Sequence, residues 1–455
     1  MKLNILLMGF LFQIFYFSVG SAQTKFLSCD VYSKTCLLQE AQKIADTITE
    51  VDPRDEAYYW VAVASASNGN IKNAMDLVKK IESFITREET LAELSIVEAK
   101  LGNFNSALEI AGSILDARHN SSRIKALENI AVEQAARGDV LAAFDTVVTI
   151  NNPYRRSQAQ SAIALSVAHT GDIPKAIKTA SKIATDYWFS PDQNSLKVAS
   201  GLVSRSGEFD NYWFFETLAR IAEYQADKGD IRGALQTSRA IPDFSGRARA
   251  LSLIAVKQAQ NKKFESAMAI ATQIDTAYGD IEPLIAIVGG LTDEGSFDAA
   301  VELAQSIKAA YGDDRAFAHL ALSSAWHDKF ETSLNYAQGL ASEAHRNQIF
   351  SEISVVMVKK GLIDEALSLV KRITTQHIYE ASIKEISLIL TREKRVDLAI
   401  KVSSSLLSVQ NYNDTMLNIS VEQARAGDVK EAVETAISIE DLMSRVIALS
   451  RLATI

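Results

Sequence analysis

Few residues of this chain are of the kinds that loops, strands or disulfide frameworks need. Among its 455 residues there are 6 prolines, 20 glycines and 2 cysteines, and aromatic residues make up 8%. So little proline and glycine argues against a protein rich in turns and strands, and two cysteines exclude a disulfide-rich scaffold. Hydrophobic residues still make up 47% of the chain. The composition therefore predicts an all-α protein with a large buried core.

The sequence also lacks the motifs of common catalytic sites. It has no glycine-rich phosphate loop, no HExxH and no Gly-x-Ser-x-Gly elbow, and its 6 histidines are scattered along the chain. The net charge of −9 at pH 7 argues against nucleic-acid binding, which needs a positive face. We therefore expect a protein that is not an enzyme, has no cofactor or metal ion, and binds no nucleic acid.

The N-terminus has the pattern of a secretory signal peptide. Lys2 precedes an apolar run over residues 3–19, and small residues at 20–22 suit a cleavage site, so we expect residues 1–22 to be removed. The alternative is an uncleaved membrane anchor, because the run is long enough to span a bilayer. Export predicts a location across a membrane, in the bacterial periplasm, with the membrane contacted only through this segment.

Both cysteines, Cys29 and Cys36, lie in residues 23–36, directly after the predicted cleavage site. Outside the cytoplasm they would be oxidised to a short disulfide loop. Residues seven apart on one helix are separated by about 10 Å, which is too far for a disulfide bond. The bond therefore requires this segment to be non-helical. Two unpaired thiols are the alternative.

From residue 37 to residue 455 one pattern recurs at a fixed spacing. Gly229 and Asp230 separate two runs of helical periodicity, so the glycine is expected to end one helix and the aspartate to cap the next. From 229 onward this turn position recurs every 33 residues, at 262, 295, 328, 361, 394 and 427, and upstream it falls at 69, 102, 138, 171 and 207. One hairpin cannot bury its apolar face alone, so the copies are expected to stack into an α-solenoid.

Small side chains occupy matching places in these copies. The residue seven before the turn is Ala or Ser in all copies but one, the residue five after it is mostly Ala, and the residue twelve after it is mostly Ile or Leu. In these offsets the chain resembles the tetratricopeptide repeat (TPR) family, although the period is one residue shorter than 34 and the family's tryptophan, tyrosine and proline are mostly absent. The resemblance covers nearly the whole predicted mature chain. It implies a right-handed α-solenoid of about eleven to twelve 33-residue helical hairpins.

Half repeats are expected at both ends of this array. Residues 37–48 match a second helix alone and residues 442–454 match a first helix alone. We interpret them as caps on the two ends of one elongated solenoid. The regular spacing fails between positions 207 and 229, where we expect one second helix to be missing.

Aromatic residues concentrate at this irregular joint, at about residues 186–215. Trp188, Tyr212 and Trp213 are among them. They are expected either to fill the gap left by the missing helix or to line an exposed pocket. In the second case the chain would be a small-molecule- or glycan-binding solenoid, or an unrecognised enzyme, with its site at residues 187–215.

A second candidate site is a row of cations that precede three successive turns by two residues: Lys359, Arg392 and Arg425. The resemblance to TPR proteins implies that this register borders the concave groove that holds peptides, where a basic row suits a carboxylate-bearing ligand. The alternative is the helix dipole, which favours cations in any last turn by about 0.3–1 kcal/mol. The sequence therefore favours a non-enzymatic scaffold for a protein or peptide partner, in the cell envelope or extracellular space.

Overall fold

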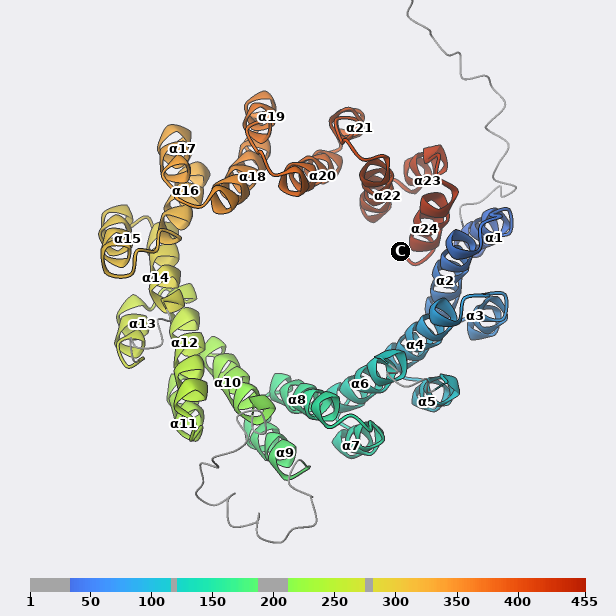
Figure 1. Cartoon of the computed structure of the whole chain (residues 1–455), viewed down its shortest axis with the longest axis horizontal. Helices are drawn as coiled ribbons and strands as arrows, with labels where there is room; N and C mark the ends of the chain where they lie inside the picture. The colour runs from blue at the N-terminus through green and yellow to red at the C-terminus, as the bar shows by residue number, and fades with distance from the viewer. Residues whose placement is uncertain (1–32, 116–120, 187–211, 275–280) are drawn as a thin grey trace, which may run out of the picture.

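The computed structural model describes residues 33–115, 121–186, 212–274 and 281–455, and within them it contains 24 helices and no strand. Even-numbered helices line the inner side of the molecule and odd-numbered helices cover the outer side (Figure 1). The inner helices are α2 (Val51–Ser67), α4 (Phe84–Leu101), α6 (Ser121–Ala136), α8 (Pro153–His169), α10 (Tyr212–Asp227), α12 (Phe244–Gln260), α14 (Glu282–Asp293), α16 (Ala316–Trp326), α18 (Glu343–Lys359), α20 (Gln376–Arg392), α22 (Val409–Arg425) and α24 (Leu442–Leu452). The outer helices are α1 (Lys34–Ala45), α3 (Ile71–Val78), α5 (Phe104–Ser113), α7 (Val140–Val148), α9 (Ile173–Asp186), α11 (Ile231–Arg239), α13 (Phe264–Ala271), α15 (Phe297–Tyr311), α17 (Phe330–Gln338), α19 (Ile363–Val370), α21 (Val396–Ser403) and α23 (Val429–Ser438).

The predicted hairpins and their turns are confirmed. Each inner helix packs against the outer helix that follows it and against the neighbouring inner helices. The turn position has a positive φ in every described copy, including three copies where it is not glycine: Lys262, Asp328 and Lys394. A left-handed residue ends one helix and reverses the chain into the next. The alanines five residues after the turn are completely buried, as Ala74 and Ala267 show at 0% exposure, because the two helices of a hairpin approach closely there.

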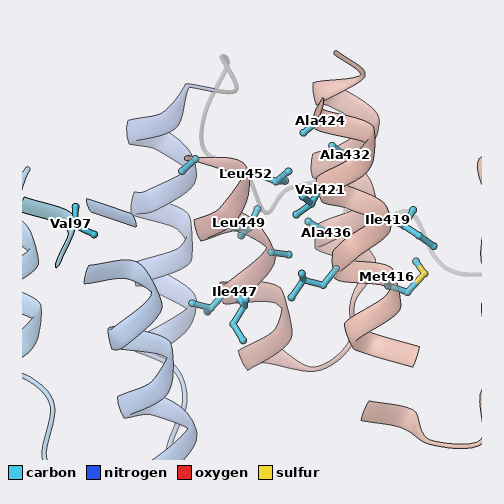
Figure 2. Packing of buried hydrophobic residues seen from close by; sticks show 14 of the residues in the cluster. Val97, Met416, Ile419, Val421, Ala424, Ala432, Ala436, Ile447, Leu449 and Leu452 are labelled. Carbon is cyan, nitrogen blue, oxygen red and sulfur yellow. The ribbon is translucent and has the colours of Figure 1, made fainter. Parts of the chain in front are cut away.

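The predicted α-solenoid with a half repeat at each end is confirmed, but its predicted elongated shape is wrong. α24 packs against both α1 and α2, so the array closes into a ring (Figure 1). Within the described residues eleven hairpins are continuous in the chain, and α24 with α1 makes a twelfth from the first and last helices. The closure buries apolar faces that each half repeat would otherwise expose. Figure 2 shows Leu449 and Leu452 of α24 among the buried residues of this part of the ring, and both are nearly inaccessible to solvent.

The second helix predicted to be missing after position 207 stays a prediction, because that position lies outside the described residues. α9 is the second helix of the hairpin that turns at Gly171, and α10 packs against both α8 and α9. The interval from 171 to 229 therefore holds one 33-residue period and 25 further residues, 187–211. Those residues, which include the turn position assigned to 207, lie outside the described part of the chain. Because the stacking continues from α8 through α10 to α12, it leaves no gap for aromatic side chains to fill.

The first described helix begins earlier than predicted. α1 starts at Lys34 rather than residue 37, because the Ser33 hydroxyl accepts a hydrogen bond from the backbone N–H of Cys36 at 3.3 Å and caps the helix. Cys36 therefore lies in a first helical turn, and it is joined in a disulfide bond. Cys29 and the predicted signal peptide lie outside the described residues, so the Cys29–Cys36 pairing stays a prediction. Among the helices that the structure describes, none is long and apolar enough to cross a bilayer.

At four joints an arginine ties a repeat to the one before it. The arginine lies in the first turn of an inner helix and donates a hydrogen bond to the backbone carbonyl of an aliphatic residue one or two positions after the end of the preceding outer helix. The pairs are Arg156 and Ile150 at 3.0 Å, Arg247 and Ile241 at 3.2 Å, Arg346 and Leu340 at 2.8 Å, and Arg445 and Ile439 at 2.8 Å. Burial lowers the pKa of the Arg445 guanidinium. These bonds satisfy buried carbonyls that the helix ends leave free.

A second recurring contact joins the two helices within a hairpin. The Thr146 hydroxyl donates to the Gln134 side chain at 2.8 Å, and the Thr237 hydroxyl donates to that of Gln225 at 2.7 Å. In the hairpin of α12 and α13 the matching glutamine is Gln258, but the position of the threonine is occupied by Ile270. The Gln258 amide is buried, and neither its oxygen nor its nitrogen has a hydrogen-bond partner among the described residues.

We expect Gln258→Met to stabilise the protein by about 1–2 kcal/mol, because it removes a buried amide that pays desolvation without a hydrogen bond. Urea unfolding followed by circular dichroism measures the change. The matched control is Gln225→Met, which should destabilise the protein by about 1 kcal/mol because it breaks the bond to Thr237. Equal effects of the two substitutions would contradict the explanation.

Candidate binding surface on the inner face of the ring

The exposed stripe of the inner helices faces the centre of the ring. In α20, for example, Ala381, Glu385 and Arg392 are exposed whereas Ile383 and Ile386 are buried. Each inner helix packs its other sides against its outer helix and its two inner neighbours, so the exposed stripe is directed inward (Figure 1). Since these side chains are accessible to solvent, the centre is open. The twelve stripes together form one continuous concave surface.

All three cations of the predicted row lie on this surface, in the last turns of α18, α20 and α22. They are not three free charges. The Arg392 and Arg425 guanidiniums bind the same carboxylate, Glu422, at 2.7 and 2.8 Å. Hydrogen bonds from Arg392 first, and also from Arg425, hold the pKa of Glu422 below its usual range. The Lys359 ammonium lies over the ring of Trp326, 5.4 Å from its centroid.

This pairing reduces the positive field of the row without covering it. The side chains of Arg392 and Arg425 are still 51% and 63% exposed, and exposed ion pairs are worth only about 0.2–1 kcal/mol. A carboxylate from a partner can therefore compete with Glu422 for either guanidinium. The helix-dipole explanation accounts for the position of the row and does not conflict with such a role.

Two of the three aromatic candidate residues, Tyr212 and Trp213, lie in the described part of the chain. Tyr212 begins α10 and is 52% exposed, and its ring meets that of Trp213 edge-on at 5.3 Å. Trp213 is half-buried and packs edge-on against Tyr154 of α8 at 5.6 Å. Trp188 lies outside the described residues, as does most of the proposed pocket at 187–215. Tyr212 and Trp213 thus belong to the stacked wall of the ring.

Other aromatic residues of the inner stripe were not predicted as site residues. Tyr59 and Trp60 of α2 meet edge-on at 5.3 Å, and the Arg451 guanidinium of α24 lies 5.1 Å from the Trp60 centroid. Burial first, and then the nearby carboxylates of Glu93, Glu89 and Glu56, raise the pKa of Tyr59 to about 12. The sequence signal that could have found them is their position, nine or ten residues before the turn, which is an inward-facing register like that of Arg392.

The described residues contain no group of three or more His, Cys, Asp or Glu side chains that could hold a metal ion. A cavity of about 250 Å³ lies between α11 and α12, lined by residues that include Arg239, Phe244 and Arg247. Arg247 donates to the backbone carbonyls of Ile241 and Pro242 and is therefore part of the loop contact described above. The cavity brings together no nucleophile and general base that would indicate catalysis.

The fold is a TPR-like array of helical hairpins. No family model and no curated protein matches the chain. Among solved structures it is similar to a chain of the Naa15/Naa10 complex bound to HypK-THB, with 13% identity over 90% of this chain and 73% of that chain and a TM-score of 0.30. It is also similar to a chain of the APC/C hetero-tetramer Cut9-Hcn1, with 10% identity, 90% and 85% coverage and a TM-score of 0.25. A circular tandem repeat protein with novel repeat topology shares 12% identity over 91% of this chain and 94% of that chain, with a TM-score of 0.16.

Proposed function

We propose that this chain is a non-enzymatic scaffold that binds a protein or peptide partner on the inner face of its ring. The observation that carries the proposal is the continuous inward stripe, which keeps aromatic rings and cations accessible on a rigid, stacked framework. Trp326 is 48% exposed there, beside Lys359. Exposed tryptophan, tyrosine and arginine are the residues most often found at the energetic centres of protein interfaces.

We also propose that the scaffold works outside the cytoplasm, in the bacterial periplasm or beyond the cell. The support is the N-terminal pattern of Lys2 followed by an apolar run and small residues. A pull-down from an envelope extract, with the purified ring as bait, tests both parts of the proposal. A partner found only in cytoplasmic extracts would contradict the location.

Reversing the charge of the basic row is expected to weaken partner binding at least tenfold. The triple variant carries Lys359→Glu, Arg392→Glu and Arg425→Glu, and it repels a carboxylate-bearing partner where the native row attracts it. Binding is measured by calorimetry with the recovered partner, and helical content and melting are expected to stay near native because all three residues are exposed.

Two controls sharpen this experiment. Reversal of Lys371, Lys401 and Lys430 makes the same change in net charge on exposed residues in or next to the outer helices α19, α21 and α23, and it should leave affinity unchanged. Glu422→Gln removes the carboxylate shared by Arg392 and Arg425 and should strengthen binding. Unchanged affinity in the inner triple variant would leave the row with its helix-dipole role alone.

A further inference from the structure

The two ends of the chain form a joint that is built like the other joints of the ring. α24 contacts α22, α23, α1 and α2, which are the contacts that an inner helix makes elsewhere with its inner and outer neighbours. The Asn68 side chain donates to the backbone carbonyl of Ala453 at 3.1 Å, and Arg451 lies over Trp60. Buried side chains of α1, α2 and α24 belong to one apolar cluster. We call this joint the seam.

The seam differs from the other joints in having no covalent link across it. In each of the eleven continuous hairpins a turn connects the inner helix to its outer helix. At the seam, α24 is the last described helix and α1 is the first. A partner that is too wide at its ends to be threaded through the ring can therefore reach the inner face only through the seam.

The size of the opening limits what the ring can hold. Twelve inner helices spaced about 9 Å apart give a circle about 35 Å across between opposite helix axes. Subtracting about 10 Å for the side chains of two facing walls leaves an opening about 25 Å wide. A 100-residue globular domain, with a radius of gyration of about 13 Å, is wider than this opening. A helix, with a diameter of about 10–12 Å, or a two-stranded coiled coil fits inside.

The inner wall suits a protein rod better than a polymer of one charge sign. Opposite charges on neighbouring inner helices already pair with one another. The pairs include Lys125 and Glu93 at 3.1 Å, Arg249 and Glu216 at 3.7 Å, and Arg392 and Glu422 at 2.7 Å. Half-buried aliphatic side chains such as Val132, Val355 and Leu388 lie on the same inner helices. A wall of mixed charge and apolar surface matches the mixed surface of a helical rod.

We propose that the ring is a clamp that encloses a rod-shaped helical protein and that the seam between α24 and α1–α2 is its clasp. This inference rests on the proposed scaffold function and adds to it the shape of the partner and its route to the inner face. The enclosed rod contacts the inner stripe, and the ring releases it by opening at the seam.

A crosslink across the seam tests the clamp. Asn68→Cys and Ile455→Cys place two exposed thiols beside the Asn68–Ala453 contact, and a short bismaleimide joins them. The control crosslink uses Leu101→Cys and Arg137→Cys, where the Arg137 side chain donates to the Lys100 carbonyl at 2.6 Å across a joint that is already covalently continuous. The probe is the partner recovered from envelope extract by the uncrosslinked ring and then purified.

A clamp predicts opposite effects for the two orders of addition. Crosslinking the seam before the partner is added should slow association at least tenfold, and crosslinking after loading should slow release into high salt at least tenfold. The control crosslink should change neither rate. A partner that binds and leaves the seam-crosslinked ring at native rates overturns the clamp but leaves the scaffold function standing. If no extract protein binds in a way that depends on the basic row, the proposed function fails and the clamp fails with it.

Discussion

Replacing Leu449 by aspartate is expected to open the ring while leaving most of the chain folded. Leu449 is 1% exposed and lies in the apolar packing between α24 and its neighbours (Figure 2). Loss of a buried leucine side chain alone costs about 2–5 kcal/mol, and a carboxylate in its place adds the cost of burying a charge. Displacing the terminal helix from α1 and α2 avoids that cost. Because the continuous hairpins keep their own contacts, helical content should change little.

Small-angle scattering measures this outcome directly as an increase in the radius of gyration, while circular dichroism follows helicity. Leu442→Asp is the matched control, since Leu442 begins the same helix but is 38% exposed, and it should leave the ring closed. A Leu449→Asp protein with the native radius of gyration and native melting would show that packing of α24 does not hold the ring shut.

The hairpins could be predicted from the sequence because their determinants are local. A left-handed turn residue, a small residue seven positions earlier and an alanine five positions later recur at fixed offsets, and each fixes one close contact within 33 residues. The turn position is not glycine at Lys262, Asp328 and Lys394, so these turns are harder to recognise in the sequence. Their positive φ shows that the turn keeps its left-handed backbone conformation without glycine. Gly207 follows Ser200 at the offset that marks a turn elsewhere, but both residues lie outside the described part of the chain.

Ring closure could not be predicted from the sequence in the same way. It depends on the sum of small rotations between successive repeats, and no single residue encodes that sum. One signal was nevertheless present: the chain starts with an unpaired second helix and ends with an unpaired first helix, and the two are complementary halves of one hairpin.

For the inner site, the sequence predicted only which positions of each helix face inward. The position of Arg392 two residues before a turn predicted an inward side chain, whereas its pairing with Glu422 depends on how closely α20 and α22 stack.

Carboxylates located 14 residues before the turn position fix the loops that lead from one repeat to the next, at Asp55, Glu88 and Asp314. Asp55 in α2 is completely buried, and its Oδ2 accepts hydrogen bonds from the backbone N–H groups of Glu82 at 2.9 Å and Ser83 at 2.6 Å. Glu88 accepts one from Leu115, and Asp314 accepts one from Ala341. The N–H groups of Glu82, Ser83 and Ala341 lie at or next to the start of a helix, where no partner within the helix exists, and that of Leu115 follows the end of α5.

We expect Asp55→Ala to destabilise the protein by about 3 kcal/mol or more, because it breaks two partly buried hydrogen bonds to a carboxylate, at about 1.5–3 kcal/mol each. The loss should be concentrated near the seam, since α2 contacts both α1 and α24. Hydrogen exchange should therefore quicken in α1, α2, α3 and α24 before it quickens in α18 or α20, and urea unfolding gives the total loss of stability.

Asp52→Ala is the matched control, because Asp52 is an exposed carboxylate in the first turn of the same helix. It contributes only about 0.3–1 kcal/mol through the helix dipole. If the two substitutions cost the same, the buried hydrogen bonds of Asp55 do not hold this loop in place.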